Sequence, residues 1–399
     1  MVASLQVSAQ AHVASWQVSS PMLAAQPDTT AADAPWTHRI DRLARNHSMS
    51  IVVGQDSTFL YRRKPFLALA PASNEKLLLS MAILEELGPD FRISTAARAP
   101  SFSGGIVDGD LWIVGGGDPE MTEGRLAVLA RNLDNAGVTR IQGAVRGSTT
   151  YFAHDWWAPG WKPDFPNNYV ALPTALAFDF NTAGGVHIKD PERRAAVALT
   201  KALRARGIGV TGKPRAGQAP PGLTEVARVV SAPLASVLSR QNVPSDNYYA
   251  ETLGKLLGAT AVSKPGTIAK GAQAIDEFAA ANGAPEIVPH DSSGLSYDNR
   301  ATADNIVRLL WYSDTQTWAG DLRSSLPSGG VGTLADRLDN LNVRAKTGTL
   351  TGVSALSGWV ASEQTGDWIE FSILSHGMPK ATASHIEDRV VTIVANSVA

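Results

Sequence analysis

The chain has 399 residues, of which 44% are hydrophobic and 18% charged, and its formal net charge is −2 at pH 7. This composition is typical of a globular protein with a large core, and it provides no basic surface for nucleic acid. The absence of cysteine excludes disulfides, thiolate metal sites and thiol nucleophiles.

Residues 1–34 differ from the rest of the chain. They are rich in Ala, Ser, Gln and Val and contain neither Lys nor Arg. They lack the basic start and the continuous apolar stretch of a secretory signal. We therefore expect a disordered leader outside the fold, with a degraded or truncated export signal as the alternative. No apolar run in the chain approaches the length of a membrane span.

The region 35–100 is predicted to form the first part of the main domain. A helix is expected around 36–46, followed by a strand pair at 48–53 and 58–63 with a turn between the strands. A helical pattern then runs from 73 to 87 and stops at Gly88 and Pro89.

The region 101–228 has a different pattern. Short apolar runs, such as 111–114 and 141–145, are separated by turns rich in Gly, Asp and Thr, and a helix is expected at 125–136. Clustered aromatic residues follow in 151–169, which we interpret as internal packing, with a ligand-facing surface as the alternative. The pattern predicts a mostly β inserted domain with one or two helices.

The region 229–399 is predicted to complete the main domain. Its expected elements are helices at 234–241 and 248–257, strands at 343–346, 354–360 and 368–375, and a final helix at 381–397.

The first chemical motif is Ser73 followed by Lys76. On a helix, positions i and i+3 lie on one face, so the lysine amine reaches the serine hydroxyl. The helix start and the apolar neighbours both disfavour a charged lysine, and a neutral Lys76 can accept the proton of Ser73. Taken alone, a helix cap at Ser73 and a surface lysine at 76 would be the simpler interpretation.

The second motif is Ser245, Asp246 and Asn247, between two predicted helices. Ser245 can relay a proton to a leaving amine, and Asn247 offers an amide to Lys76 and to a substrate carbonyl. By itself, the tripeptide is more typical of a helix cap, which can coexist with a catalytic role.

The third motif, Lys-Thr-Gly-Thr at 346–349, ends one predicted strand. Lys346 would supply positive potential, and the hydroxyls of Thr347 and Thr349 suit a carboxylate. Gly348 would let the strand approach a substrate backbone closely. The backbone N–H groups of Ser73 and Thr349 would form an oxyanion hole. An ordinary hairpin is the simpler interpretation of this string in isolation.

Each of the three motifs occurs once, and they occur in the order expected for serine acyl transfer. Other chemistries find little support. The eight histidines show no metal-binding spacing. The glycines at 115–117 are no dinucleotide fingerprint, and we see no βαβ pattern around them. We expect neither a metal nor a cofactor.

From about residue 50 onward, the chain resembles the D-alanyl-D-alanine carboxypeptidase/endopeptidase family of class C low-molecular-mass penicillin-binding proteins. The resemblance depends on the three motifs and on further strings at 71–77, 115–119, 291–296, 326–327 and 332–334. It implies an α/β fold of the penicillin-binding-protein and β-lactamase-like type, with an antiparallel sheet flanked by helices. The large insert predicted between Ser73 and Ser245 also occurs in this family.

The resemblance implies a serine DD-peptidase that cleaves D-Ala-D-Ala in peptidoglycan stem peptides outside the cytoplasmic membrane and is acylated by penicillin. It implies Ser73 as nucleophile, Lys76 as base, Ser245 as proton relay, and Asn247, Lys346, Thr347, Gly348 and Thr349 around the substrate. A β-lactamase or esterase on the same scaffold and a cell-wall-binding protein with low turnover are the alternatives.

Two positions depart from the family pattern. Val331 precedes Gly332, where family members often have an acidic residue. Some members carry an acidic residue in the insert that meets the amine of the stem-peptide side chain. Rough placement puts Ser148 near that position, so the resemblance leaves the stem-peptide preference open, as it does the balance of carboxypeptidase and endopeptidase activity.

Overall fold

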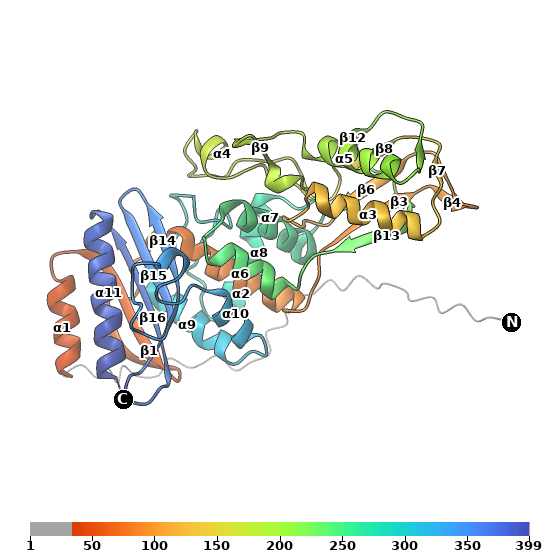
Figure 1. The fold of residues 1–399 in the computed structure, drawn as a ribbon. Helices are drawn as coiled ribbons and strands as arrows, with labels where there is room; N and C mark the ends of the chain where they lie inside the picture. Colours follow the sequence, from red (N-terminus) through yellow and green to blue (C-terminus); the bar gives the residue numbers. More distant parts are fainter. Residues whose placement is uncertain (1–33, 399) are drawn as a thin grey trace.

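The computed structural model describes residues 34–398, so the predicted leader lies outside the described part apart from Ala34. Figure 1 shows three regions side by side: a sheet with two helices on one face, a central group of helices, and the insert at the far end. The cleft described below lies between these regions.

The main sheet contains five antiparallel strands in the order β14-β15-β16-β1-β2. Their bounds are β14 Val343–Leu350, β15 Val353–Ala361, β16 Trp368–His376, β1 Ser48–Gln55 and β2 Thr58–Arg63. The N-terminal hairpin joins the three C-terminal strands because β1 pairs with β16. Strand β14, which carries the third motif, is therefore at one edge of the sheet.

Helices cover both faces of this sheet. Helices α1 (Pro35–Ala44) and α11 (Lys380–Ser397) pack on one face, where Ile40, Val390 and Val394 are fully buried. Helix α9 (Ala303–Asp314) lies against β1 and β16 on the other side. The sequence pattern had not indicated α9, nor α8 (Ile268–Ala281) and α10 (Ala319–Ser325).

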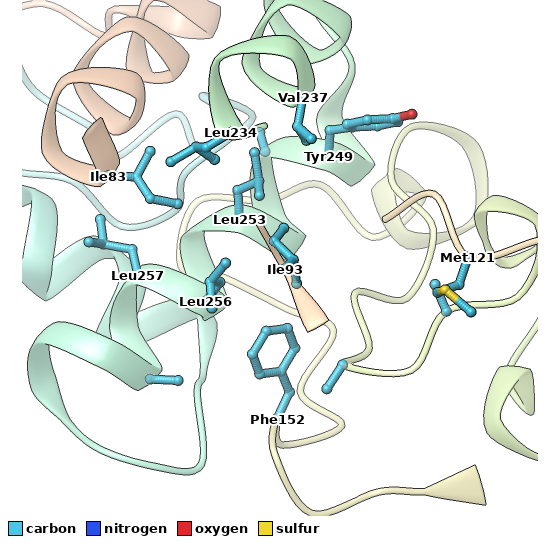
Figure 2. Packing of buried hydrophobic residues seen from close by; sticks show 14 of the residues in the cluster. Ile83, Ile93, Met121, Phe152, Leu234, Val237, Tyr249, Leu253, Leu256 and Leu257 are labelled. Atoms are coloured by element: carbon cyan, nitrogen blue, oxygen red, sulfur yellow. The ribbon is translucent and has the colours of Figure 1, made fainter. Parts of the chain in front are cut away.

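Helix α2 (Glu75–Leu87) lies at the centre of the helical group. Every residue from position 75 to position 84 is buried, as expected for a helix that is enclosed on all sides. Helices α6 (Leu234–Asn242) and α7 (Asn247–Leu257) pack against it. Figure 2 shows Ile83 of α2 in the same cluster as Leu253 of α7 and Phe152 of the insert. The helical group and the insert thus share one core.

The insert leaves and rejoins the helices through the antiparallel pair β3 (Ser94–Ala99) and β13 (Thr224–Val230). Strand β3 lies just before the predicted range 101–228, and β13 ends two residues after it. They belong to a five-stranded sheet of order β12-β8-β6-β3-β13, beside a four-stranded sheet of order β11-β7-β5-β4. The other strands of these two sheets are β4 Ser101–Ser103, β5 Ile106–Asp108, β6 Leu111–Gly115, β7 Arg140–Ile141, β8 Val145–Ser148, β11 Gly209–Val210 and β12 Arg215–Gly217. The division of the chain into domains stays a prediction.

Two helices of the insert, α3 (Glu123–Asn135) and α5 (Pro191–Ala205), pack on each other. Strand β6, helix α3 and the parallel strand β8 make a βαβ unit, and the glycines at 115–117 lie at the end of its first strand. The prediction that no such unit exists there was wrong. Strands of two to five residues are too short to show a period, so only their pairing reveals the unit.

Candidate active site

Ser73 lies in a single 3₁₀ turn, Ala72–Asn74, immediately before α2. Ala72 has a positive φ of 48°, and two glycines enclose the turn. A Cβ on Gly348 would lie 2.6 Å from the carbonyl oxygen of Pro71, and one on Gly294 would clash with the carbonyl of Ala72. Gly348 therefore accommodates the nucleophile turn, whereas the sequence had suggested only a close approach to substrate.

Lys76 is fully buried beneath Ser73. Its Nζ donates hydrogen bonds to Ser73 Oγ at 3.1 Å, to Asn247 Oδ1 at 2.8 Å and to the carbonyl oxygen of Ser293. Burial lowers the pKa of Lys76 to about 8, against the opposing effect of nearby carboxylates, of which Asp291 has the largest effect. A lysine with this pKa is partly neutral near physiological pH, as a general base requires.

The second motif approaches from the loop before α7. Ser245 has a positive φ of 62°, and its Oγ accepts a hydrogen bond from Lys346 Nζ at 2.9 Å. Asp246 caps the helix by accepting from the backbone N–H of Tyr249 at 3.0 Å. The cap predicted as the simpler interpretation therefore exists beside the contact between Ser245 and Lys346.

Lys346 is fully buried and also donates to the carbonyl oxygen of Thr347 at 3.0 Å. Burial lowers its pKa well below the usual value, and the charges of Lys76 and Lys380 add to this effect. Its amine lies behind the cleft surface, in contact with Ser245. Thr347 and Thr349, which line the cleft, are therefore the residues of this motif that can contact a substrate directly.

Asn247 links the main domain to the insert. Its Oδ1 accepts from Lys76, and its Nδ2 donates to the carbonyl oxygen of Tyr169 at 3.0 Å. The backbone of the insert thus fixes the orientation of an amide that touches the lysine. The sequence predicted the contact with Lys76 but not the one with Tyr169.

A cleft of about 670 Å³ opens over these groups. One side, which we call the catalytic wall, is lined by Ser73, Ser245, Asn247, Thr347 and Thr349, with Lys76 and Lys346 buried behind it. The other side, which we call the insert wall, is lined by Lys162, Asp164, Phe165 and Tyr169. The structure therefore brings Ser73, Ser245, Asn247, Thr347 and Thr349 to one cleft, with Lys76 and Lys346 directly behind it. Asp246 caps α7 and Gly348 packs against the nucleophile turn.

Ser148 does not line this cleft. It is buried in β8, where its hydroxyl hydrogen-bonds that of Thr150 at 2.9 Å. The acidic residue that the insert presents to the cleft is Asp164, sixteen positions further along the chain. The rough placement of Ser148 was wrong because counting along the chain takes no account of how the loop folds back over the cleft.

Several polar residues of the site were not assigned a role from the sequence. Asn74 donates to Ser357 Oγ at 2.7 Å, which attaches the nucleophile turn to β15. Ser293 supplies a carbonyl to Lys76, although its string at 291–296 was noticed only as a resemblance. Within residues 34–398, no cluster of three or more His, Asp or Glu side chains is arranged to hold a metal ion.

A profile of the D-Ala-D-Ala carboxypeptidase 3 (S13) family matches residues 37–185 and 181–397. The chain belongs to this family. It is 28% identical to a D-alanyl-D-alanine carboxypeptidase of Actinomadura sp. (strain R39), over 84% of this chain and 78% of that protein. It is 31% identical to a carboxypeptidase of Mycobacterium tuberculosis, over 79% of this chain and 73% of that protein.

Solved structures support the same fold. The structure of penicillin binding protein 4 from Haemophilus influenzae superposes with a TM-score of 0.78 at 19% identity, covering 90% of this chain and 99% of that one. A complex of the same protein with a β-lactam gives a TM-score of 0.74. A predatory peptidoglycan endopeptidase of Bdellovibrio bacteriovorus gives 0.56 at 19% identity, over 88% of this chain and 93% of that one.

Family and fold together confirm several predictions. The protein is an α/β serine peptidase of the penicillin-binding-protein type with a large β-containing insert, and its activity is that of a DD-peptidase. Its family acts on peptidoglycan, which lies outside the cytoplasmic membrane. In the described part of the chain, every helix is too short or too polar to cross a bilayer.

Proposed function

We propose that this protein hydrolyses the terminal D-Ala-D-Ala bond of peptidoglycan stem peptides through an acyl-enzyme on Ser73. The observation that carries the proposal is the buried Lys76, whose Nζ lies 3.1 Å from Ser73 Oγ and whose pKa is lowered to about 8. A neutral amine at this distance can take the hydroxyl proton as the serine attacks.

Acylation moves one proton across the cleft. Ser73 Oγ bonds to the carbonyl carbon of the penultimate D-Ala while Lys76 accepts its proton. Ser245, held by Lys346, relays a proton to the amine of the departing D-Ala as the peptide bond breaks. The backbone N–H groups of Ser73 and Thr349 stabilise the negative oxygen that forms between these steps. Water then attacks the ester, which releases the shortened peptide and restores the Ser73 hydroxyl.

The terminal carboxylate of the substrate is assigned to Thr347 and Thr349 on the edge of β14. Thr349 is exposed to the cleft, and the Thr347 hydroxyl hydrogen-bonds Thr333 at 2.8 Å. In its protonated form, Lys346 contributes positive potential from behind them. An edge strand can also pair with the backbone of an extended peptide.

The insert wall is assigned to the stem-peptide side chain. Asp164 is exposed at the cleft, and an anionic carboxylate there suits an amine on the substrate. Lys162 is also exposed on the same wall, with its Nζ 4.8 Å from the ring centre of Tyr297. A side chain that carries both an amine and a carboxylate would complement this pair of charges.

Mass spectrometry of the protein with penicillin tests the proposal. The β-lactam carbonyl and carboxylate match the same groups, and opening the ring leaves the leaving nitrogen tethered, which hinders water. We expect an adduct of protein plus intact penicillin on the peptide that contains Ser73, which persists well beyond one peptide turnover. The Ser73→Ala variant should form none, and Ser101→Ala, at an exposed serine of the insert, should react like wild type.

Other outcomes favour the alternatives. Rapid recovery of free protein with accumulating penicilloate would indicate a β-lactamase. A well-folded protein that forms no adduct and cleaves no peptide would indicate a binding protein. A cross-linked dimer of stem peptides, offered in parallel with the linear peptide, measures endopeptidase against carboxypeptidase activity.

A further inference from the structure

Three carboxyl groups are fully buried beneath the nucleophile: Glu75, Glu251 and Asp291. The mechanism above uses Lys76 but none of these acids. Burying a carboxylate is costly unless it is paired or hydrogen-bonded, so three such groups beside one catalytic amine require a reason.

Glu251 is connected to Lys76 by a short chain of hydrogen bonds. Its Oε1 accepts from the backbone N–H groups of Ser292 at 3.1 Å and Ser293 at 2.8 Å. The carbonyl of Ser293 in turn accepts from Lys76 Nζ. Glu251 also lies one turn after Asn247 on α7, so both side chains are on the same face of that helix. Helix α7 therefore reaches the lysine by two routes.

Asp291 has a different environment. Its carboxylate accepts from the backbone N–H groups of Gly294 at 2.9 Å and Ser296 at 2.8 Å, from Asn299 Nδ2 at 2.8 Å and from Trp161 Nε1 at 2.6 Å. These bonds fix the loop that carries Ser293. Asp291 therefore holds the Ser293 carbonyl in place against Lys76.

Glu75 and the second oxygen of Glu251 lack such donors. Within residues 34–398, Glu251 Oε2 and both carboxyl oxygens of Glu75 are buried without a hydrogen-bond partner. Burial, strengthened by the charge of Asp291, raises the pKa of Glu251 to about 8 and that of Glu75 well above its usual value. Glu251 therefore gains and loses its proton in the same pH range as Lys76, so its anion is present while Lys76 titrates.

We propose that Glu251 is a positioning residue for the catalytic base: it fixes the Ser293 carbonyl against Lys76, and its charge, with that of Glu75, sets the pH at which Lys76 becomes neutral. The proposal rests on Lys76 acting as the base. An ionised Glu251 favours the protonated lysine, whereas a protonated Glu251 favours the neutral amine.

The sign of the expected effect follows from the groups that face Lys76. The acids Asp291, Asp246, Glu251 and Glu75 favour the charged lysine. Lys346 and Lys76 disfavour each other's charged form, so Lys346 opposes the charged lysine when its own amine is protonated. Replacing Glu251 by glutamine removes one anion but keeps an oxygen that accepts from the two backbone N–H groups. Lys76 then releases its proton at lower pH. The acylation rate rises with pH as Lys76 loses its proton, and this rise, which we call the acidic limb, therefore occurs at lower pH. The constant rate above it is the plateau.

The test is the second-order rate of acylation by a fluorescent penicillin between pH 5 and 9. In Glu251→Gln we expect the acidic limb to move down by roughly one pH unit, with a plateau within about threefold of wild type. Glu251→Ala, which also loses the backbone acceptor, should lower the plateau by roughly tenfold or more. A purely structural glutamate would change the plateau and leave the limb in place.

Two further variants keep the test decisive. Glu75→Gln removes the other unpartnered acid without touching the Ser292 and Ser293 contacts, and it should move the limb in the same direction. Glu192→Gln replaces a buried glutamate of the insert that pairs with His154, and its limb should match wild type. If thermal unfolding shows that Glu251→Gln does not fold, the acidic limb of Glu75→Gln tests the proposal in its place.

An unmoved limb in the folded glutamine variants would overturn the proposal while leaving acylation of Ser73 intact. Failure of the proposed function looks different. In that case wild type itself would not be acylated on Ser73, or Lys76→Arg would be acylated as fast as wild type.

Discussion

The two walls of the cleft are built differently. The catalytic wall depends on buried polar groups with several partners each: Lys76 and Lys346 are fully buried, and Lys76 makes three hydrogen bonds. On the insert wall, Lys162, Asp164 and Tyr169 are all exposed. Buried charges respond strongly to small changes because water does not screen them, whereas exposed ones contribute little each. We therefore expect chemistry to reside on one wall and substrate preference on the other.

The largest effect should come from the nucleophile. Ser73→Ala should lower kcat for release of D-Ala by on the order of 10³-fold or more, because the nucleophile and its base work as a unit. Amino-acid detection with a peptide ending in D-Ala-D-Ala measures this, with Ser101→Ala as the matched control. Turnover near that of wild type in a folded Ser73→Ala protein would show that the nucleophile is not Ser73 on the catalytic wall.

The second effect concerns the base. Lys76→Arg keeps a positive charge but cannot accept a proton, so acylation should fall by roughly 10²-fold or more. In wild type, Lys76 is protonated below its pKa of about 8, and the rate should fall about tenfold per pH unit below that value. Penicillin acylation measured against pH checks both statements. The control is Lys201→Arg, at an exposed lysine of the insert.

An unchanged rate in Lys76→Arg, or a wild-type profile that is flat from pH 5 to 8, would contradict the assignment of the base. Either result would mean that another group takes the Ser73 proton.

The third effect tests the edge of β14. A substrate amidated at its C-terminus should react about 10- to 100-fold more slowly in kcat/KM than the free acid, since hydrogen bonds to a charged group contribute roughly 1.5–3 kcal/mol each. Thr349→Val should reduce this preference. Equal kcat/KM values for the acid and the amide would show that Thr347 and Thr349 do not recognise the terminal carboxylate.

The smallest effect should come from the insert wall. Asp164→Asn should lower kcat/KM by about tenfold for stem peptides with a free side-chain amine. Penicillin has no such amine, so its acylation rate should stay within about twofold. Asp134→Asn, at an exposed residue of the insert that pairs with Arg206, is the control. An equal fall in kcat/KM for the peptide and in the acylation rate with penicillin would show that Asp164 affects the chemistry itself and not substrate preference alone.

Where the sequence succeeded, the signal was local. The pair Ser73 and Lys76 lies three positions apart, and the cap at Asp246 acts within one helical turn. Strands β1, β2 and β14 to β16 show the expected alternation or apolar runs, and all five were predicted. Helix α5 was missed although Asp190 and Pro191 mark its start, because the short strands around it suggested a β region.

Where the sequence failed, the answer depended on residues far apart in the chain. Lys76 meets Ser293, which is 217 positions away, and Asn247 meets Tyr169 at a separation of 78. Counting positions along the chain pointed to Ser148, whereas the folded insert presents Asp164 to the cleft. The close approach at Gly348 was expected from the substrate, whereas the structure shows it with the nucleophile turn. No local pattern records which backbone carbonyl a folded chain will bring to a buried amine or to an amide side chain.

The sequence by itself therefore determined the reaction class, because the order and local spacing of three short motifs already require a serine, a base and a carboxylate site. Only the tertiary structure decided how these groups work. Burial of Lys76 and Lys346 lowers their pKa values, and the same enclosure places Glu75 and Glu251 beside the base. Burial is a property of the packed chain, since it depends on what surrounds a side chain from every direction.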